Sequence, residues 1–231
     1  MIGMDMLEDL LPERDRSGRI HGVVVGVVTN NQDPDGLGRV KLKFPWLSDT
    51  DESNWARMVS PMAGKERGLY FLPEVDDEVL VIFEHGQVDH PFVLGALWNG
   101  KDKPPAVNEG GKNDRRVMKS RSGHTITLDD TDGAEKITIA DKTGKNTIVL
   151  DAKQNAVAIA ADKDVTIQAG GNITLSSSGG DVAIKCKNLS IEAQQKFALK
   201  ASQEGALEAS AGLKITCMAG VNVNSGALEV K

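Results

Sequence analysis

The sequence predicts an all-β protein: an N-terminal OB-fold barrel followed by a C-terminal intertwined triple-stranded β-helix, or needle, formed by a homotrimer. Three observations predict this architecture. Short β-branched or alternating runs, bounded by turn residues, fill the chain up to residue 100. An eight-residue apolar repeat then continues to residue 230. Of the aromatic residues, Phe197 alone follows residue 99, so an ordinary aromatic core cannot pack the second region.

The barrel prediction depends on five short strands, expected at residues 21–29, 38–44, 55–59, 77–84 and 91–98. The first is a β-branched run followed by the turn-forming residues 30–36, and the second alternates polar and apolar side chains. The last two form a hairpin-like pair around residues 84–90. Five strands in so short a stretch are typical of a small closed barrel.

A segment rich in turn and breaker residues separates the two regions, which also differ in charge. We assign 1–19 to a short N-terminal segment, 20–100 to the barrel, 101–121 to a linker and 122–231 to the needle. Residues 1–103 carry 11 basic and 18 acidic side chains, and residues 104–231 carry 16 and 15. A net charge of −7 on the barrel side disfavours nucleic acid as a partner.

The repeat predicts the assembly. Its apolar anchors follow one another seven to nine residues apart, and apolar and polar residues alternate around each anchor. Eight residues provide one strand and one turn, so one chain builds one wall whose apolar face it cannot cover. Three walls close into a prism with the apolar side chains inside. The predicted trimer core is Val165, Ile167, Ile173, Leu175, Val182, Ile184, Leu189, Ile191, Phe197, Leu199, Leu207, Leu213, Ile215, Val221 and Val223.

The end of the predicted rod and its two cysteines lead to further expectations. Unpaired strand edges at residues 227–231 need a cap, for which Leu228, Val230 and Lys231 are the predicted contacts. Four repeats, or roughly 19 Å, separate Cys186 from Cys217, beyond the reach of a disulfide bond. An acidic N-terminus without a basic region is expected to be neither a signal peptide nor a transit peptide, so synthesis in the cytoplasm is expected.

Other candidate sites have simpler interpretations. Arg39, Lys41 and Lys43 alternate on one strand, as on a solvated face or a small basic patch. The loop residues His85, Asp89 and His90 have metal-ligand character but no fourth partner, and turn formation explains them better. Residues 129–133 resemble a calcium loop without its final glutamate, and carboxylate pairs such as Glu74 and Glu78 lack a cleft. No nucleophile, phosphate-loop or dinucleotide motif is present, so no catalytic, cofactor or metal residue is predicted.

The ordered motifs resemble one family of proteins. Residues 35–46 read DGLGRVKLKFPW and residues 90–100 read HPFVLGALWNG, and matching stretches occur at 22–28, 55–57, 63–64, 73–81, 122–130 and 133–137. Together they resemble VgrG, the phage baseplate protein V family and the central spikes of contractile phage tails. Asp76 departs from the pattern, because the family usually has glycine there.

The resemblance implies a non-enzymatic spike of a phage tail, type VI secretion system or extracellular contractile particle. Such a spike sits on the inner tube and baseplate, punctures the target membrane and carries a PAAR-like tip and effectors. Only 19 residues precede the barrel, so a separate hub protein is expected. Assembly is expected in the cytoplasm, with delivery outside or into a target cell. The alternatives are a tail-fibre or adhesin stalk whose barrel binds carbohydrate, and a cell-wall-degrading enzyme.

Overall fold

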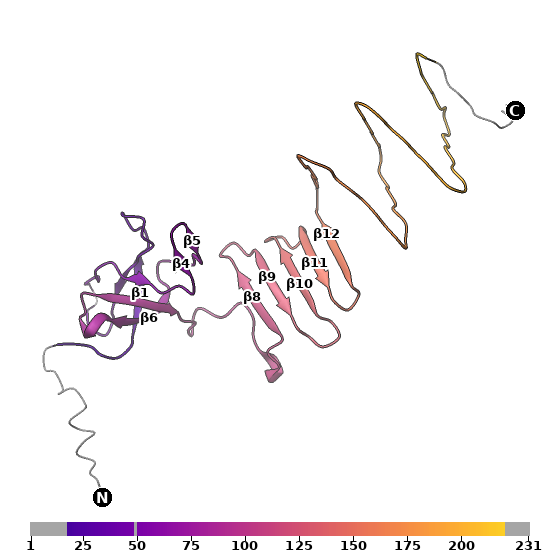
Figure 1. Cartoon of the computed structure of the whole chain (residues 1–231). Helices are drawn as coiled ribbons and strands as arrows, with labels where there is room; N and C mark the ends of the chain where they lie inside the picture. Colours follow the sequence, from indigo (N-terminus) through magenta and orange to yellow (C-terminus); the bar gives the residue numbers. More distant parts are fainter. Residues whose placement is uncertain (1–17, 49, 220–231) are drawn as a thin grey trace, which may run out of the picture. The chain divides into compact units, whose positions relative to one another are not determined.

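The computed structural model describes residues 18–48 and 50–219, and nearly all of its regular structure is β-sheet (Figure 1). Its strands form two five-stranded sheets and one small hairpin. The exceptions are two short 3₁₀ turns, η1 (Glu84–Gly86) and η2 (Glu109–Gly111). Among the described residues, no helix has the length and apolarity needed to cross a bilayer. The chain divides into two units, residues 1–166 and 167–231.

The first sheet is a closed barrel. Its strands are β1 (Val24–Asn30), β2 (Lys41–Lys43), β3 (Arg57–Met58), β6 (Glu78–Phe83) and β7 (Pro91–Ala96). They pair in the order β2-β1-β6-β7-β3, with β3 and β7 parallel and the other neighbours antiparallel. An antiparallel bridge between Val40 and Ala56 joins the two outer strands, with N···O distances of 3.0 and 2.7 Å. All five strands therefore lie where the sequence predicts them, and the sheet has no open edge at this bridge.

Alternation along the strands fills the barrel. In β6, Val79, Val81 and Phe83 point inward and are almost fully buried, whereas the residues between them are partly exposed. Phe44 packs against Phe83 with ring centroids 5.5 Å apart. Burial of each such side chain contributes roughly 1.5–3 kcal/mol, so the barrel has a core of its own. That core consists of Val28, Val40, Leu42, Phe44, Ala56, Val79, Val81, Phe83 and Val93.

The turn before β6 keeps the geometry that glycine would provide. Asp76 has a φ of 76°. Its backbone N–H donates to the Val28 carbonyl at 2.9 Å, which holds the turn against β1. The neighbouring Asp77 carboxylate accepts the Glu74 N–H at 2.8 Å. The substitution of glycine by aspartate thus preserves the turn and places a non-glycine residue in left-handed backbone.

The second sheet is a five-stranded antiparallel meander. It consists of β8 (Arg115–Lys119), β9 (Thr125–Asp129), β10 (Lys136–Ala140), β11 (Thr147–Asp151) and β12 (Ala156–Ala160), each paired with the next along the chain. β8 lies inside the segment that the sequence analysis assigns to a linker. A short hairpin, β4 (Ala63–Gly64) with β5 (Arg67–Gly68), completes the strands of the first unit.

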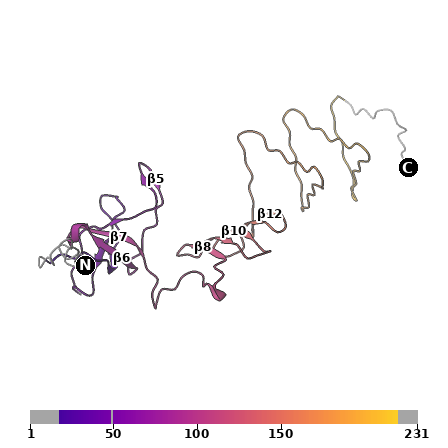
Figure 2. The ribbon, with the colours of Figure 1, turned by 60° about the horizontal axis from the view of Figure 1, so that its bottom comes forward.

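From residue 161 to residue 217 the chain is extended but carries no strand assignment. Straight runs alternate with sharp bends in both views of this segment (Figures 1 and 2). The bends fall at residues 162–163, 170–171, 178–180, 187, 194–195, 202–203 and 210–211. Their spacing is close to eight residues, so the period of the sequence repeat appears in the backbone. The triple-stranded β-helix itself stays a prediction.

Replacing Asp76 with glycine should raise the free energy of unfolding of the barrel by about 0.5–1 kcal/mol, because glycine adopts a positive φ without steric cost. Urea unfolding followed by tryptophan fluorescence measures this change. The signal reports the barrel, since Trp46, Trp55 and Trp98 all belong to that region. Asp51→Gly is the control, because exposed Asp51 lies outside the positive-φ residues. A lower midpoint for Asp76→Gly than for the parent chain would show that the aspartate side chain stabilises this turn.

Candidate functional site

The register of the second sheet gathers its apolar side chains on one face, here called the apolar sheet face. Each residue of one row stands directly opposite its neighbour in the next strand. The first row is Met118, Ile126, Ile139, Ile148 and Ile159, and the second is Arg116, Leu128, Ile137, Leu150 and Val157. The apolar members are 36–68% exposed. Nine large apolar side chains on one face, without cover from the described part of the chain, mark an interaction surface.

The opposite face of the same sheet is small and polar, and it carries a row of alternating charges. Arg115 stands opposite Asp129, Asp129 opposite Lys136, and Lys136 opposite Asp151. Arg115 Nε lies 3.3 Å from Asp129 Oδ2. Opposite charges on neighbouring strands favour this register over any slipped one. The charge row therefore helps to hold the apolar rows in line on the other face.

The turns that join the strands use aspartate as a backbone acceptor. Asp129 accepts the Thr131 hydroxyl and N–H, and Asp141 accepts the same two groups of Thr143. These bonds, led by the threonine hydroxyl, lower the pKa of Asp141 to about 2 and hold the pKa of Asp129 below its usual range. Residues 129–133, which resemble a calcium loop in sequence, thus form an aspartate-capped turn. The stability that both carboxylates contribute is present above pH 4 and declines as the pH falls through their lowered pKa values.

The extended segment beyond the sheet exposes its apolar residues more completely. Ile167, Leu175 and Leu199 are 74–77% exposed, and the other predicted core residues up to Ile215 are exposed as well. Among the described residues 163–217, no backbone hydrogen bond joins one straight run to another. Cys186 and Cys217 are free and exposed in two separate runs. The predicted core residues Val221 and Val223 and the tip contacts Leu228, Val230 and Lys231 lie outside the described residues.

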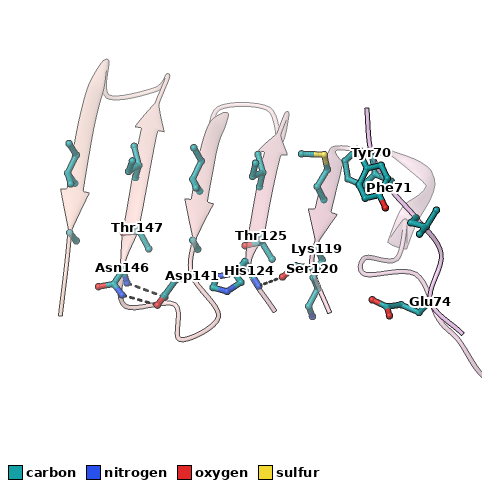
Figure 3. A pocket seen from close by; sticks show the side chains of 18 residues that line it. Tyr70, Phe71, Glu74, Lys119, Ser120, His124, Thr125, Asp141, Asn146 and Thr147 are labelled. Atoms are coloured by element: carbon teal, nitrogen blue, oxygen red, sulfur yellow. Dashed lines mark hydrogen bonds between the residues drawn. The ribbon is translucent and has the colours of Figure 1, made fainter. Parts of the chain in front are cut away.

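A hollow of about 890 Å³ lies over the apolar sheet face, and residues of all five strands from β8 to β12 line it (Figure 3). The first apolar row forms its floor, and Tyr70, Phe71 and Leu72 of the barrel border it. Ser120, His124 and Asn146 line the side where the strands turn. In the close-up, Tyr70 and Phe71 stand beyond β8, at the end of the row of isoleucines. The sequence pattern does not indicate that the barrel and the sheet border one hollow, because their proximity depends on the path of the linker.

Two of the three basic residues that alternate on the second predicted strand, Arg39 and Lys41, are paired with carboxylates. Arg39 donates through Nε and Nη2 to Asp33 at 2.8 and 2.7 Å and through Nη2 to Asp35 at 2.6 Å, and Lys41 pairs with Glu52. The Arg39 guanidinium holds the pKa of Asp33 well below its usual range. Asp33 also accepts the Leu37, Arg39 and Asp35 N–H groups, so the ion pair closes the β1–β2 loop rather than presenting free positive charge.

The histidine-containing loop also acts as a turn. His85 has a φ of 51° within η1, and His90 Nδ1 contacts Gln87 Oε1 at 3.0 Å. No group of three or more His, Cys, Asp or Glu residues that could hold a metal ion occurs in the part of the chain that the structure describes. The observed contacts of the loop therefore give it a structural role between β6 and β7.

Comparison with known proteins finds relatives of the barrel and of the region after it. The model of the type VI secretion system and phage-baseplate injector OB domain matches residues 24–98, which span the five barrel strands. VgrG1a and VgrG5, type VI secretion spike proteins of Pseudomonas aeruginosa, are 32% and 31% identical over 143 and 137 residues. The barrel is therefore similar to this injector OB domain, and the chain resembles the VgrG and phage baseplate V family.

The match to the VgrG proteins covers a limited part of each. The alignments span 56% and 58% of this chain, but only 22% of VgrG1a and 17% of VgrG5. The actin cross-linking toxin VgrG1 of Vibrio cholerae is 27% identical over 148 residues, which are 62% of this chain and 13% of that toxin. The alignments thus cover less than a quarter of each of these larger proteins, and the resemblance that the motifs indicate is confirmed.

Reversing one charge in the row should weaken the second sheet of this VgrG relative. Lys136→Glu would place like charges opposite both Asp129 and Asp151, at a cost of about 0.5–2 kcal/mol. Thermal unfolding followed by far-ultraviolet circular dichroism measures the loss, which should shrink at high salt. The control is Lys153→Glu, which makes the same charge change in the exposed β11–β12 turn. Equal losses for the two variants would show that net charge, not register, is responsible.

Proposed function

We propose that the chain is a non-enzymatic structural spike of a contractile injection machine and that it acts as a homotrimer. Similarity to VgrG1a and VgrG5 supports the spike role, because both are named as spike proteins of type VI secretion. The barrel would sit as a collar at the tube end, and the needle would lead during firing. A narrow, hydrogen-bonded rod with a dry interior would puncture a membrane by concentrating force on a small area. This action is mechanical and would require no catalysis.

The main support for this proposal is the unpaired, extended backbone of residues 164–217. Their backbone is extended, bends about every eight residues and has no pairing partner within the described chain. Extended backbone groups must be paired to be buried, and apolar side chains on such a segment need cover from water. Two further copies with the same repeat supply both, since each offers the same unpaired edges and the same apolar face. A single copy satisfies neither requirement.

The proposal includes partners at both ends of the trimer. A separate hub protein and the inner tube of the baseplate would bind the barrel end, and a PAAR-like tip protein would cover the needle end. Effectors would travel with the tip, and the target membrane would be met on firing. Assembly would take place in the cytoplasm, with delivery outside or into a target cell. The acidic barrel, at −7 over residues 1–103, makes nucleic acid an unfavourable partner.

The trimer is tested by mass. Light scattering of the purified chain should give about 74 kDa, three times 24.7 kDa, and the unboiled sample should keep this size in detergent. Ile184→Asp should abolish the trimer, because it would bury three carboxylates near one axis without partners. Lys185→Asp, at the next and outward position, should leave the mass unchanged. A parent chain that runs at 24.7 kDa would remove the physical basis of the proposal.

The tip partner is tested by truncation. The chain without residues 221–231 should stay trimeric, because most of the repeat remains, but should fail to retain a PAAR-like protein in a pull-down that the full chain passes. Alanine substitution of Lys153, far from this end in sequence, serves as the control. Undiminished capture by the truncated trimer would place the tip contact elsewhere on the molecule and leave the spike without the predicted cap.

A further inference from the structure

Residues 69–72, here called the aromatic segment, connect the β4–β5 hairpin to the turn before β6. Both ends of this segment are anchored. At its start, the Leu69 N–H donates to the Met62 carbonyl at 3.0 Å, and the Ser60 hydroxyl donates to the Leu69 carbonyl at 2.9 Å. Just past its end, Arg121 Nη1 donates to Glu74 Oε2 at 2.9 Å. The ion pair ties the aromatic segment to the turn between β8 and β9.

Despite this anchoring, the aromatic side chains are not covered within the described chain. Tyr70 is 76% exposed and Phe71 is 69% exposed. The first row of the apolar sheet face, which forms the floor of the adjacent hollow, is also exposed, with Met118 at 51%. Two apolar surfaces therefore border one hollow without filling it. Burial of either surface would yield roughly 25 cal/mol for each Å² removed from water.

The residues around the hollow indicate which kind of partner would fill it. The hollow is bordered mainly by apolar residues and opens on the apolar sheet face, which the proposed trimer turns toward its axis. Between residues 99 and 196 the chain has no Phe, Trp or Tyr side chain that could fill the barrel end of that interior. Tyr70 and Phe71 are large enough to do so, and they stand at the β8 end of the row (Figure 3). The surface that needs filling is thus continuous with the surface that binds the other copies.

We propose that Tyr70 and Phe71 pack against the apolar sheet face of a neighbouring copy and close the barrel end of the trimer interior as an aromatic plug. The occupant of the hollow is therefore a second copy of this chain. This inference rests on the proposed trimer. It assigns to the barrel a second task beside its collar role, namely to keep water out of the needle interior at the end opposite the tip.

Photo-crosslinking of the full chain tests the contact directly. A benzophenone amino acid at position 71 in a mixture of normal and ¹⁵N-labelled chains should give crosslinks between copies, to peptides that contain β8 or β9. The same amino acid at position 98 is the control, because Trp98 is equally exposed, at 70%, but does not border the hollow. Crosslinks confined to one chain, or absent from the sheet peptides, would overturn the plug.

A stability measurement provides the second test. The double variant Tyr70→Ser/Phe71→Ser should stay folded, since neither side chain belongs to the barrel core, but its trimer should dissociate in detergent at a temperature about 5 °C or more below that of the parent. Trp98→Ser should show no such shift. Equal shifts for the two variants would overturn the plug while the trimer stands. A monomeric parent chain would instead overturn the proposed function on which the plug rests.

Discussion

Backbone hydrogen bonding is the constraint on which the rest of this structure depends. An extended chain can enter a dry interior only if its N–H and C=O groups find partners. Up to residue 160 the chain meets this requirement alone, first by closing the barrel through the Val40–Ala56 bridge and then by folding back on itself from β8 to β12. Beyond residue 161 the described chain no longer turns back far enough to pair with itself. The change from self-pairing to unpaired backbone separates the part that pairs within one chain from the part that, in the proposed trimer, would pair with other copies.

The two sheets bury apolar surface in different ways, which explains why only one of them is complete. The barrel curves around its own interior, so Val79 and Val81 are covered by strands of the same chain. The meander is an open sheet whose isoleucines all stand on one face, and an open sheet cannot cover its own face. Its polar face is instead stabilised by charge pairs, and its turns are stabilised by aspartate caps. Within the described residues, the apolar face of the meander therefore stays uncovered.

Sequence patterns predicted the features that depend on local periodicity. The five barrel strands follow from runs such as residues 77–84, and the bends beyond residue 161 follow from the octad repeat. The sequence does not indicate β8, because Arg115 and Arg116 stand in a breaker-rich stretch that becomes a strand only through pairing with β9. It does not indicate the apolar rows of the meander either, because the strands start nine to eleven residues apart and this spacing hides their alignment. The contact of Tyr70 with the hollow is tertiary, so no local pattern contains it.

Register links the two parts of the proposed needle. Side chains alternate between faces along a strand, so a slip of one residue between β9 and β10 would move Ile137 and Ile139 to the polar face. The charge row opposes such a slip, because it would separate Asp129 from Lys136. The same register fixes where β12 ends and hence the level at which the first unpaired run begins. Three intertwined chains match their repeats only if their first unpaired runs begin at the same level along the needle. Because the meander sets this level within each chain, the three chains do not have to establish it through contacts with one another.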